Sequence, residues 1–185
     1  MGNHKMTGFE ELYRYVMERS RRLGIPHIPL EDAYVLQGTS FAALANAEGV
    51  ALDLGAGIGF SALWILQAAK AFGKRLIAVE REARFFEELK GLAEKAGFEA
   101  VHGDALDFLK GFEEPVAFAF VDVDKEQYPD VLELLYEKLG KGGVMLFHNA
   151  IFPPPPQTFF EKLKELKVKY LVVPTSLGLV VAAKT

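Results

Sequence analysis

The chain has 185 residues, half of them hydrophobic and a quarter charged, which is the composition of an ordinary globular protein. It contains no cysteine, which excludes disulfides, thiolate metal sites and a cysteine nucleophile. The formal net charge is −4 and no long basic run is present, which argues against nucleic acid as a partner. Because neither a signal peptide nor an apolar run of about 20 residues is visible, we expect a cytoplasmic protein without a membrane partner.

The N-terminal part of the chain is predicted to form two helices. Apolar residues between Phe9 and Leu23 recur at helical spacing. The segment Gly24-Ile25-Pro26 then ends this helix, because glycine adopts left-handed backbone angles and proline has no N–H donor. A second helix is expected over residues 31–46.

From residue 50 onwards, short apolar runs alternate with amphipathic stretches. The runs expected to form strands are 50–54, 76–79, 100–101, 117–121 and 144–147. The stretches expected to form helices are 60–72, 82–95, 105–111 and 126–139. Nearly continuous apolar strands that alternate with helices indicate a parallel sheet covered on both faces.

The C-terminal end breaks this alternation. After a predicted helix over 159–166, two strands over 169–173 and 179–183 are joined by only a short connection. They must be antiparallel, because a parallel crossover needs about a dozen residues. The sequence therefore predicts a Rossmann-like, doubly wound α/β fold with a mostly parallel seven-stranded sheet, a C-terminal antiparallel hairpin and a helical N-terminal cap. We expect one domain, 1–185, with the cap at about 7–46 and the core at 47–185.

A glycine-rich segment lies between the first predicted strand and the helix after it. It reads Asp53-Leu54-Gly55-Ala56-Gly57-Ile58-Gly59-Phe60-Ser61. Its glycines permit a tight turn and let a ligand approach the backbone, and the helix N-terminus favours an anionic ligand group. A dinucleotide-binding loop would have its third glycine at position 60, where this chain has Phe60. Asp53, just before the loop, suits a ligand ammonium group, met directly or through water.

Acidic residues follow the next two predicted strands. Ligands of open α/β sheets bind beyond the carboxyl ends of the strands, so these side chains are candidates for cofactor binding. Glu80 ends the second strand and suits the two hydroxyls of a ribose, although an NAD site would also have an acid near this position. Asp104 follows the third strand and suits an adenine amino group; capping the next helix is its alternative role, and the two are compatible.

Two further motifs follow the fourth and fifth predicted strands. The first contains Asp122, Lys125 and Tyr128 in an Asp-x-x-Lys-x-x-Tyr pattern. The second is Lys141-Gly142-Gly143, then a strand that ends in His148-Asn149. Together with an acid ahead of Gly-x-Gly-x-Gly, these motifs resemble class I S-adenosylmethionine-dependent methyltransferases, and most closely the catechol and caffeoyl-coenzyme A O-methyltransferase family. The similarity runs from about residue 38 to the C-terminus.

The resemblance implies an O-methyltransferase that uses S-adenosylmethionine and a small hydroxyl-bearing acceptor, for which an aromatic compound is one candidate. The family commonly forms homodimers, and its N-terminal region covers the cofactor and part of the acceptor pocket. The cofactor-binding residues expected here are Asp53, Gly55, Ala56, Gly57, Gly59, Ser61, Glu80, Arg81, Gly103, Asp104, Ala105 and Asp122.

The family's chemistry also implies catalytic roles. A divalent cation, held there by two acids and an asparagine, lowers the pKa of vicinal hydroxyls, and a lysine takes the proton. Carried over, Asp122 and Asn149 become metal ligands and Lys125 becomes the base.

His148 departs from the family, which has an aspartate at this position. The imidazole removes one negative charge and one hard oxygen ligand, so a magnesium site is disfavoured. Three hypotheses stay open. In the first, Asp122, His148 and Asn149 hold a softer metal such as manganese or zinc. In the second, His148 replaces the metal and acts as the base. In the third, His148 is a hydrogen-bonded strand-end residue without a chemical role.

Other functions compete with the O-methyltransferase. A NAD-dependent oxidoreductase is disfavoured by Phe60 and by the lack of length for a separate substrate domain. Because His148 departs from the family, a second hypothesis stays open: a protein of the same fold that binds S-adenosylmethionine without turnover. A methyltransferase acting on RNA or protein is a further alternative, although the acidic balance argues against RNA.

Overall fold

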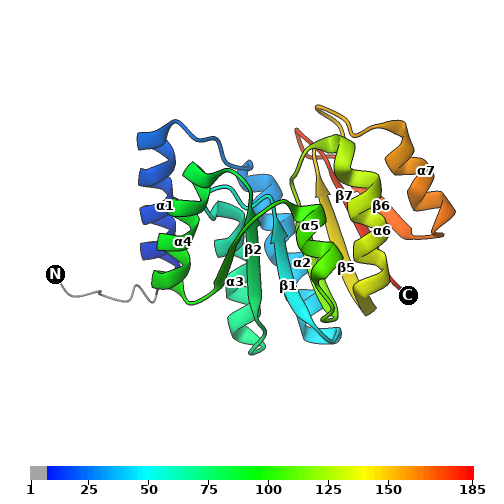
Figure 1. Ribbon diagram of the computed structural model, residues 1–185, viewed down its shortest axis with the longest axis horizontal. Helices are drawn as coiled ribbons and strands as arrows, with labels where there is room; N and C mark the ends of the chain where they lie inside the picture. The colour runs from blue at the N-terminus through cyan, green and yellow to red at the C-terminus, as the bar shows by residue number, and fades with distance from the viewer. Residues whose placement is uncertain (1–7) are drawn as a thin grey trace.

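The computed structural model describes residues 8–185 and shows two helices ahead of alternating strands and helices (Figure 1). The α-helices are α1 (Phe9–Leu23), α2 (Leu30–Asn46), α3 (Phe60–Ala71), α4 (Ala83–Ala96), α5 (Ala105–Gly111), α6 (Tyr128–Lys138) and α7 (Gln157–Glu165). The strands are β1 (Val50–Leu54), β2 (Leu76–Glu80), β3 (Glu99–His102), β4 (Val116–Val121), β5 (Leu139–His148), β6 (Lys169–Val173) and β7 (Leu179–Ala183). Residue 7, where the predicted cap begins, lies outside the described residues.

All seven strands form one sheet in the order β3-β2-β1-β4-β5-β7-β6. Strands β1 to β5 are parallel, whereas β7 is antiparallel to both β5 and β6. The predicted doubly wound, mostly parallel sheet with its C-terminal hairpin is therefore confirmed. The strand order reverses between β1 and β4, and ligands of such sheets bind in the crevice at this reversal.

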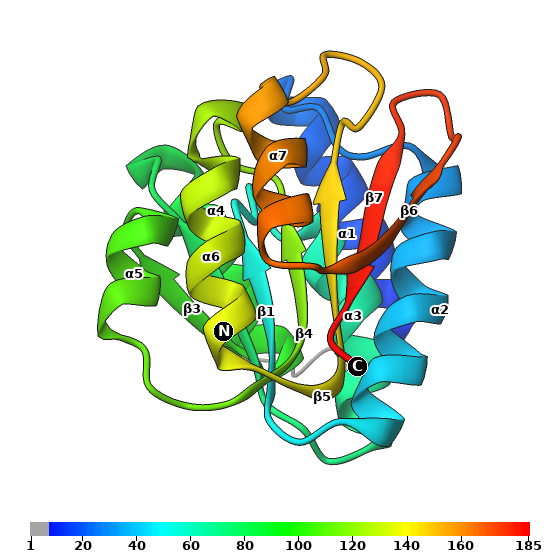
Figure 2. The same ribbon diagram turned by 90° about the vertical axis from the view of Figure 1, so that its right-hand side faces the viewer.

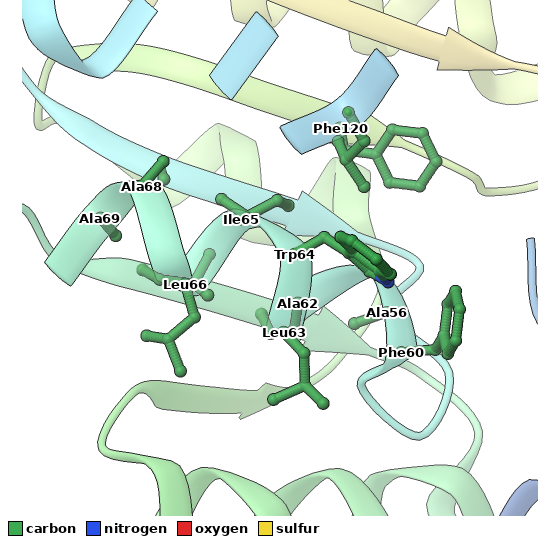
Figure 3. Close-up of a cluster of buried hydrophobic side chains, with 14 of the residues drawn as sticks. Ala56, Phe60, Ala62, Leu63, Trp64, Ile65, Leu66, Ala68, Ala69 and Phe120 are labelled. Atoms are coloured by element: carbon green, nitrogen blue, oxygen red, sulfur yellow. The ribbon is translucent and has the colours of Figure 1, made fainter. Parts of the chain in front are cut away.

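Helices cover both faces of the sheet, and each face has its own hydrophobic core. Helices α1, α2 and α3 lie on one face, and α5, α6 and α7 lie on the other (Figure 2). Helix α3 is apolar around most of its circumference because it packs on the sheet and also beneath α1 and α2. Its side chains fill the cluster drawn in Figure 3, where Trp64 and Phe60 lie near the end of β1. The start of α3, which the glycine loop feeds, is thus held firmly against the core.

Several element boundaries differ from the prediction by a residue or two, and two of the differences have a clear physical reason. Strand β5 begins at Leu139 rather than near Val144, because Leu139 pairs with Val116 ahead of an irregularity in the ladder. The predicted helix over 126–139 begins as a 3₁₀ turn, η1 (Lys125–Gln127), and becomes α6 only at Tyr128. Within residues 8–185, no helix is both long and apolar enough to cross a membrane.

Candidate active site

The glycine loop after β1 has a backbone that only glycine adopts comfortably. Gly55, Gly57 and Gly59 have φ values of 83°, 56° and 98°. A Cβ on Gly55 would lie 2.1 Å from the backbone oxygen of Asp122, and one on Gly59 would lie 2.4 Å from a Leu92 methyl carbon. The loop is therefore pressed against the end of β4 on one side and against α4 on the other.

Glu80 anchors the loop to the end of β2. One carboxylate oxygen accepts a 2.8 Å hydrogen bond from the Gly57 N–H, and the other accepts one of 2.8 Å from the Glu82 N–H. The side chain is 6% exposed and also lines a cavity of about 290 Å³ beside the loop. Its oxygens retain lone pairs that a ligand hydroxyl can use.

Asp104 performs the capping role that was the alternative prediction. Its Oδ1 accepts from the backbone N–H groups of Leu106 and Asp107, at 2.8 and 3.2 Å, and its Oδ2 accepts from Gln127 Nε2 at 3.0 Å. The Gln127 hydrogen bond is the largest cause that holds the pKa of Asp104 below its usual value. Asp104 lines the same cavity as Glu80, so the cap and a ligand-binding role are compatible here.

Asp53 lies beneath the loop rather than in a cavity. It is fully buried, accepts a 2.7 Å hydrogen bond from Ser61 Oγ, and its Oδ1 has no hydrogen-bond partner within residues 8–185. Burial raises the pKa of Asp53 to about 7, although the Ser61 hydrogen bond acts in the opposite direction. Ser61 does line a cavity, so Asp53 can act on a ligand through that hydroxyl.

This pKa makes stability depend on pH. At a pH below the pKa that Asp53 has in the unfolded chain, Asp53 is protonated in both the folded and the unfolded state. At higher pH the unfolded chain releases this proton, whereas the folded protein retains it up to about pH 7. The free energy of unfolding therefore falls as the pH rises through this range. We expect Asp53→Asn to stabilise the protein relative to wild type by about 3 kcal/mol more at pH 8 than at pH 5. Urea unfolding of both proteins at the two pH values measures this difference. An equal difference at both values would contradict the raised pKa.

Most of the predicted cofactor residues meet around two adjoining cavities at the carboxyl edge of the sheet. The first, of about 290 Å³, is lined by Gly55, Gly57, Glu80, Arg81, Gly103, Asp104, Ala105 and Asp122 from the predicted set. The second, of about 260 Å³, is lined by Gly55, Ala56, Gly57, Ser61 and Asp122 from that set, and by His148 and Asn149. Asp53 and Gly59 support the loop without being among the lining residues of either cavity.

The connection between α1 and α2 contributes residues that the sequence did not single out. Ile25 and Pro26 line the first cavity, and Pro26, His27 and Ile28 line the second. In the sequence this segment indicated only the end of a helix. Phe85 and Gln127, from α4 and η1, also line the first cavity and were likewise not predicted.

Asp122 lines both cavities and faces two basic side chains, Lys125 and His148. Its Oδ1 lies 3.2 Å from Lys125 Nζ, and its Oδ2 lies 3.3 Å from His148 Nδ1. Burial opposes the charged carboxylate, but His148 and Lys125 outweigh it and hold the pKa of Asp122 below its usual value. Lys125 Nζ also donates to Tyr128 Oη at 2.9 Å and to the Val123 carbonyl at 3.4 Å.

His148 has a second acidic partner, Asp32, which the sequence did not indicate. The His148 Nε2 atom lies 2.8 Å from Asp32 Oδ2, and both side chains are almost completely buried. Although burial lowers the pKa of His148, Asp122 and Asp32 together raise it above the usual value. In the sequence Asp32 resembles an ordinary acid in the first turn of a helix, and only the packing of α2 against β5 brings it to His148.

The three predicted metal ligands do not fit a divalent cation in this arrangement. Both ring nitrogens of His148 face carboxylates, and the two oxygens of Asp122 face Lys125 and His148. The side-chain amide of Asn149 donates to the Phe152 carbonyl at 2.8 Å. Within the described part of the chain, no group of three or more His, Cys, Asp or Glu residues is placed to hold a metal ion. The donor set therefore disfavours the metal hypothesis for His148.

The sheet order, the glycine loop after β1 and the acid that ends β2 define the class I methyltransferase fold. A family model described as a methyltransferase domain matches residues 52–150, more than half of the chain, and the chain belongs to this family. An O-methyltransferase from Bacillus cereus, solved in complex with SAH, has the same fold, with a TM-score of 0.75 at 18% identity over 95% of this chain and 91% of that one.

Two plant proteins are similar in sequence. One, from Arabidopsis thaliana, is assigned by name to the caffeoyl-CoA O-methyltransferases and is 25% identical over 77% of this chain. The other is a flavonoid 3',5'-methyltransferase from Vitis vinifera, 27% identical over 74% of this chain. The resemblance to the caffeoyl-coenzyme A O-methyltransferases is thus confirmed. The chain spans only 63% and 60% of the length of these relatives.

Proposed function

We propose that the protein is an S-adenosylmethionine-dependent O-methyltransferase that acts on a hydroxyl group of a small acceptor. The observation that carries this proposal is the pair of adjoining cavities that share Gly55, Gly57 and Asp122. Methyl transfer requires the sulfonium methyl group and the acceptor oxygen to meet in line across a short distance. Two cavities with a common wall provide one compartment for each reactant.

The first cavity suits the adenosine part of the cofactor. Glu80, Asp104 and Gln127 line this cavity. In the proposal, Glu80 accepts from the ribose hydroxyls, and Asp104 and Gln127 bind the adenine. Ile25 and Phe85 supply apolar surface for the faces of the purine ring. The backbone of the glycine loop and the start of α3 favour the carboxylate of the methionine part. The complex of the Bacillus cereus neighbour with SAH, the demethylated cofactor, supports this assignment.

The second cavity suits the acceptor. It is lined by Ser61, Asp122, His148 and Asn149 beside apolar residues such as Ile28 and Leu177. Polar groups at one side of an apolar cavity fit a small molecule that presents a hydroxyl group. The plant relatives, named for caffeoyl-CoA and flavonoids, support an aromatic acceptor. The homodimer that the family resemblance implies stays a prediction.

A labelling experiment tests this function. We expect the protein to transfer the methyl group of isotope-labelled S-adenosylmethionine to caffeoyl-coenzyme A, to a hydroxylated flavonoid or to catechol, with one S-adenosylhomocysteine formed per methylated product. Asp122→Asn, which alters the group shared by both cavities, is the matched control and should lose at least about 100-fold in rate. Label in an RNA or protein fraction but in none of the small acceptors would favour the alternative acceptor classes. Consumption of NAD instead of S-adenosylmethionine would contradict the proposal.

A further inference from the structure

The side chains of Asp32 and His148 form a buried pair at the wall of the acceptor cavity. Asp32 comes from the first turn of α2 and is 0% exposed, whereas His148 ends β5 and is 4% exposed. Asp32 Oδ2 lies 2.8 Å from His148 Nε2. An ionised carboxylate only accepts hydrogen bonds, so Nε2 must carry a hydrogen, and the lone pair of the neutral ring is then on Nδ1.

The Nδ1 atom of His148 is the ring nitrogen that Asp32 does not engage. It is buried, and although Asp122 Oδ2 lies 3.3 Å away, it makes no well-formed hydrogen bond among residues 8–185. His148 lines the second cavity together with Ser61 and Asn149. A buried ring nitrogen without a partner at a cavity wall points to a donor that arrives with the ligand.

We propose that His148 Nδ1 takes the proton of the acceptor hydroxyl and that Asp32 is the positioning residue that orients the imidazole for this step. This inference rests on the proposed function, which supplies the cofactor and the acceptor. It selects one of the hypotheses that the sequence left open for His148, and it adds a residue from the N-terminal cap to the reaction.

The surroundings of Lys125 argue against the lysine as the base. Its Nζ atom has three acceptors, Tyr128 Oη, Asp122 Oδ1 and the Val123 carbonyl, at 2.9, 3.2 and 3.4 Å. Three acceptors therefore surround the Nζ atom and engage it within the chain's own structure. Lys125 is not among the described residues that line either cavity. Lys125 instead holds Asp122 in place.

The proposed step balances in atoms and charge. The acceptor oxygen forms a bond to the methyl carbon as its proton moves to His148 Nδ1. The bond from the methyl carbon to sulfur breaks, and its electron pair stays on sulfur, which becomes a neutral thioether. The imidazolium formed lies between the carboxylates of Asp32 and Asp122, which stabilise it and raise the pKa of His148. Water later removes the proton. The acceptor is thus deprotonated by residues of the chain itself.

Nitrogen-15 NMR of histidine-labelled protein tests the pair without an acceptor. The chain has four histidines, and loss of one signal in His148→Gln assigns the resonance. We expect neutral His148 to carry its hydrogen on Nε2. In Asp32→Asn we expect its titration midpoint to fall by about one pH unit or more, because the carboxylate that stabilises the imidazolium is lost. A wild-type ring with its hydrogen on Nδ1, or an unchanged midpoint in Asp32→Asn, would overturn the proposal.

Kinetics separate a positioning role from a structural one. Asp32→Asn should lower kcat by about 100-fold or more and leave the KM for S-adenosylmethionine unchanged. Glu31→Gln is the matched control, since it removes a charge one position away and its amide can still accept from Ser176. It should keep the wild-type kcat and the His148 midpoint. If the wild type binds no S-adenosylmethionine, the proposed function fails while the NMR result stands; if methyl transfer survives in Asp32→Asn, only the present inference fails.

Discussion

Gly55→Ala is expected to destabilise the protein by at least about 4 kcal/mol and to abolish cofactor binding. The new Cβ would lie 2.1 Å from the backbone oxygen of Asp122 and 2.7 Å from its carbonyl carbon. Neither strand can move away easily, because β1 and β4 are paired up to Leu54 and Val121. The φ of 83° adds strain for any residue with a side chain. Urea unfolding and calorimetry with S-adenosylmethionine measure the two effects.

Gly57→Ala is the matched control for this prediction. Gly57 also has a positive φ, of 56°, but a Cβ there would meet no described atom within 4 Å. We expect only the left-handed strain, about 1–2 kcal/mol. Equal destabilisation by the two substitutions would show that close approach to β4 is not what requires glycine at position 55.

Glu80→Gln is expected to weaken S-adenosylmethionine binding by about 100-fold, because hydrogen bonds to a charged group contribute about 1.5–3 kcal/mol each. The carboxylate accepts from the backbone N–H groups of Gly57 and Glu82 with separate oxygens. A glutamine amide has only one oxygen, so its NH₂ group must face one of these N–H donors. The glycine loop would lose an anchor, and the ribose would lose an acceptor.

Glu99→Gln is the control for charge removal at β3, the neighbouring strand. Glu99 pairs with Arg75 on an exposed surface and lies outside the described linings of both cavities. Such surface pairs contribute little, and we expect less than about 1 kcal/mol in stability and no change in affinity. If Glu80→Gln binds S-adenosylmethionine as the wild type does, Glu80 neither anchors the loop nor contacts the ribose.

The sequence predicted those parts of the site that depend on local signals. A glycine loop directly after a strand, and acids at successive strand ends, are neighbours in space in any doubly wound sheet. Gly55, Glu80 and Asp104 were therefore found without a structure. The start of β5 was missed because its glycine-rich residues 140–143 predict a turn, whereas sheet pairing extends the strand through them.

The parts that escaped prediction depend on tertiary contacts. Asp32 and His148 are 116 positions apart, and nothing near Asp32 in the sequence distinguishes it from a solvated helix acid. The sequence predicted that Asp53 meets a ligand ammonium group directly or through water; its burial and its bond to Ser61, which lines the second cavity, could be seen only in the fold. The side chains that a metal would need were present in the sequence, but their pairing with Asp32, Lys125 and the Phe152 carbonyl could be seen only in the fold.

Calorimetric titration of the wild-type protein with S-adenosylmethionine, and separately with NAD, tests the central claim most directly. We predict one S-adenosylmethionine per chain with micromolar affinity, no binding of NAD, and loss of the S-adenosylmethionine signal in Gly55→Ala. The affinity should be the same with and without added manganese or magnesium, since the groups around Asp122 do not fit a metal ion. Binding of NAD without binding of S-adenosylmethionine would contradict the account, and the loop, Glu80 and Asp104 would then have to belong to a dinucleotide site.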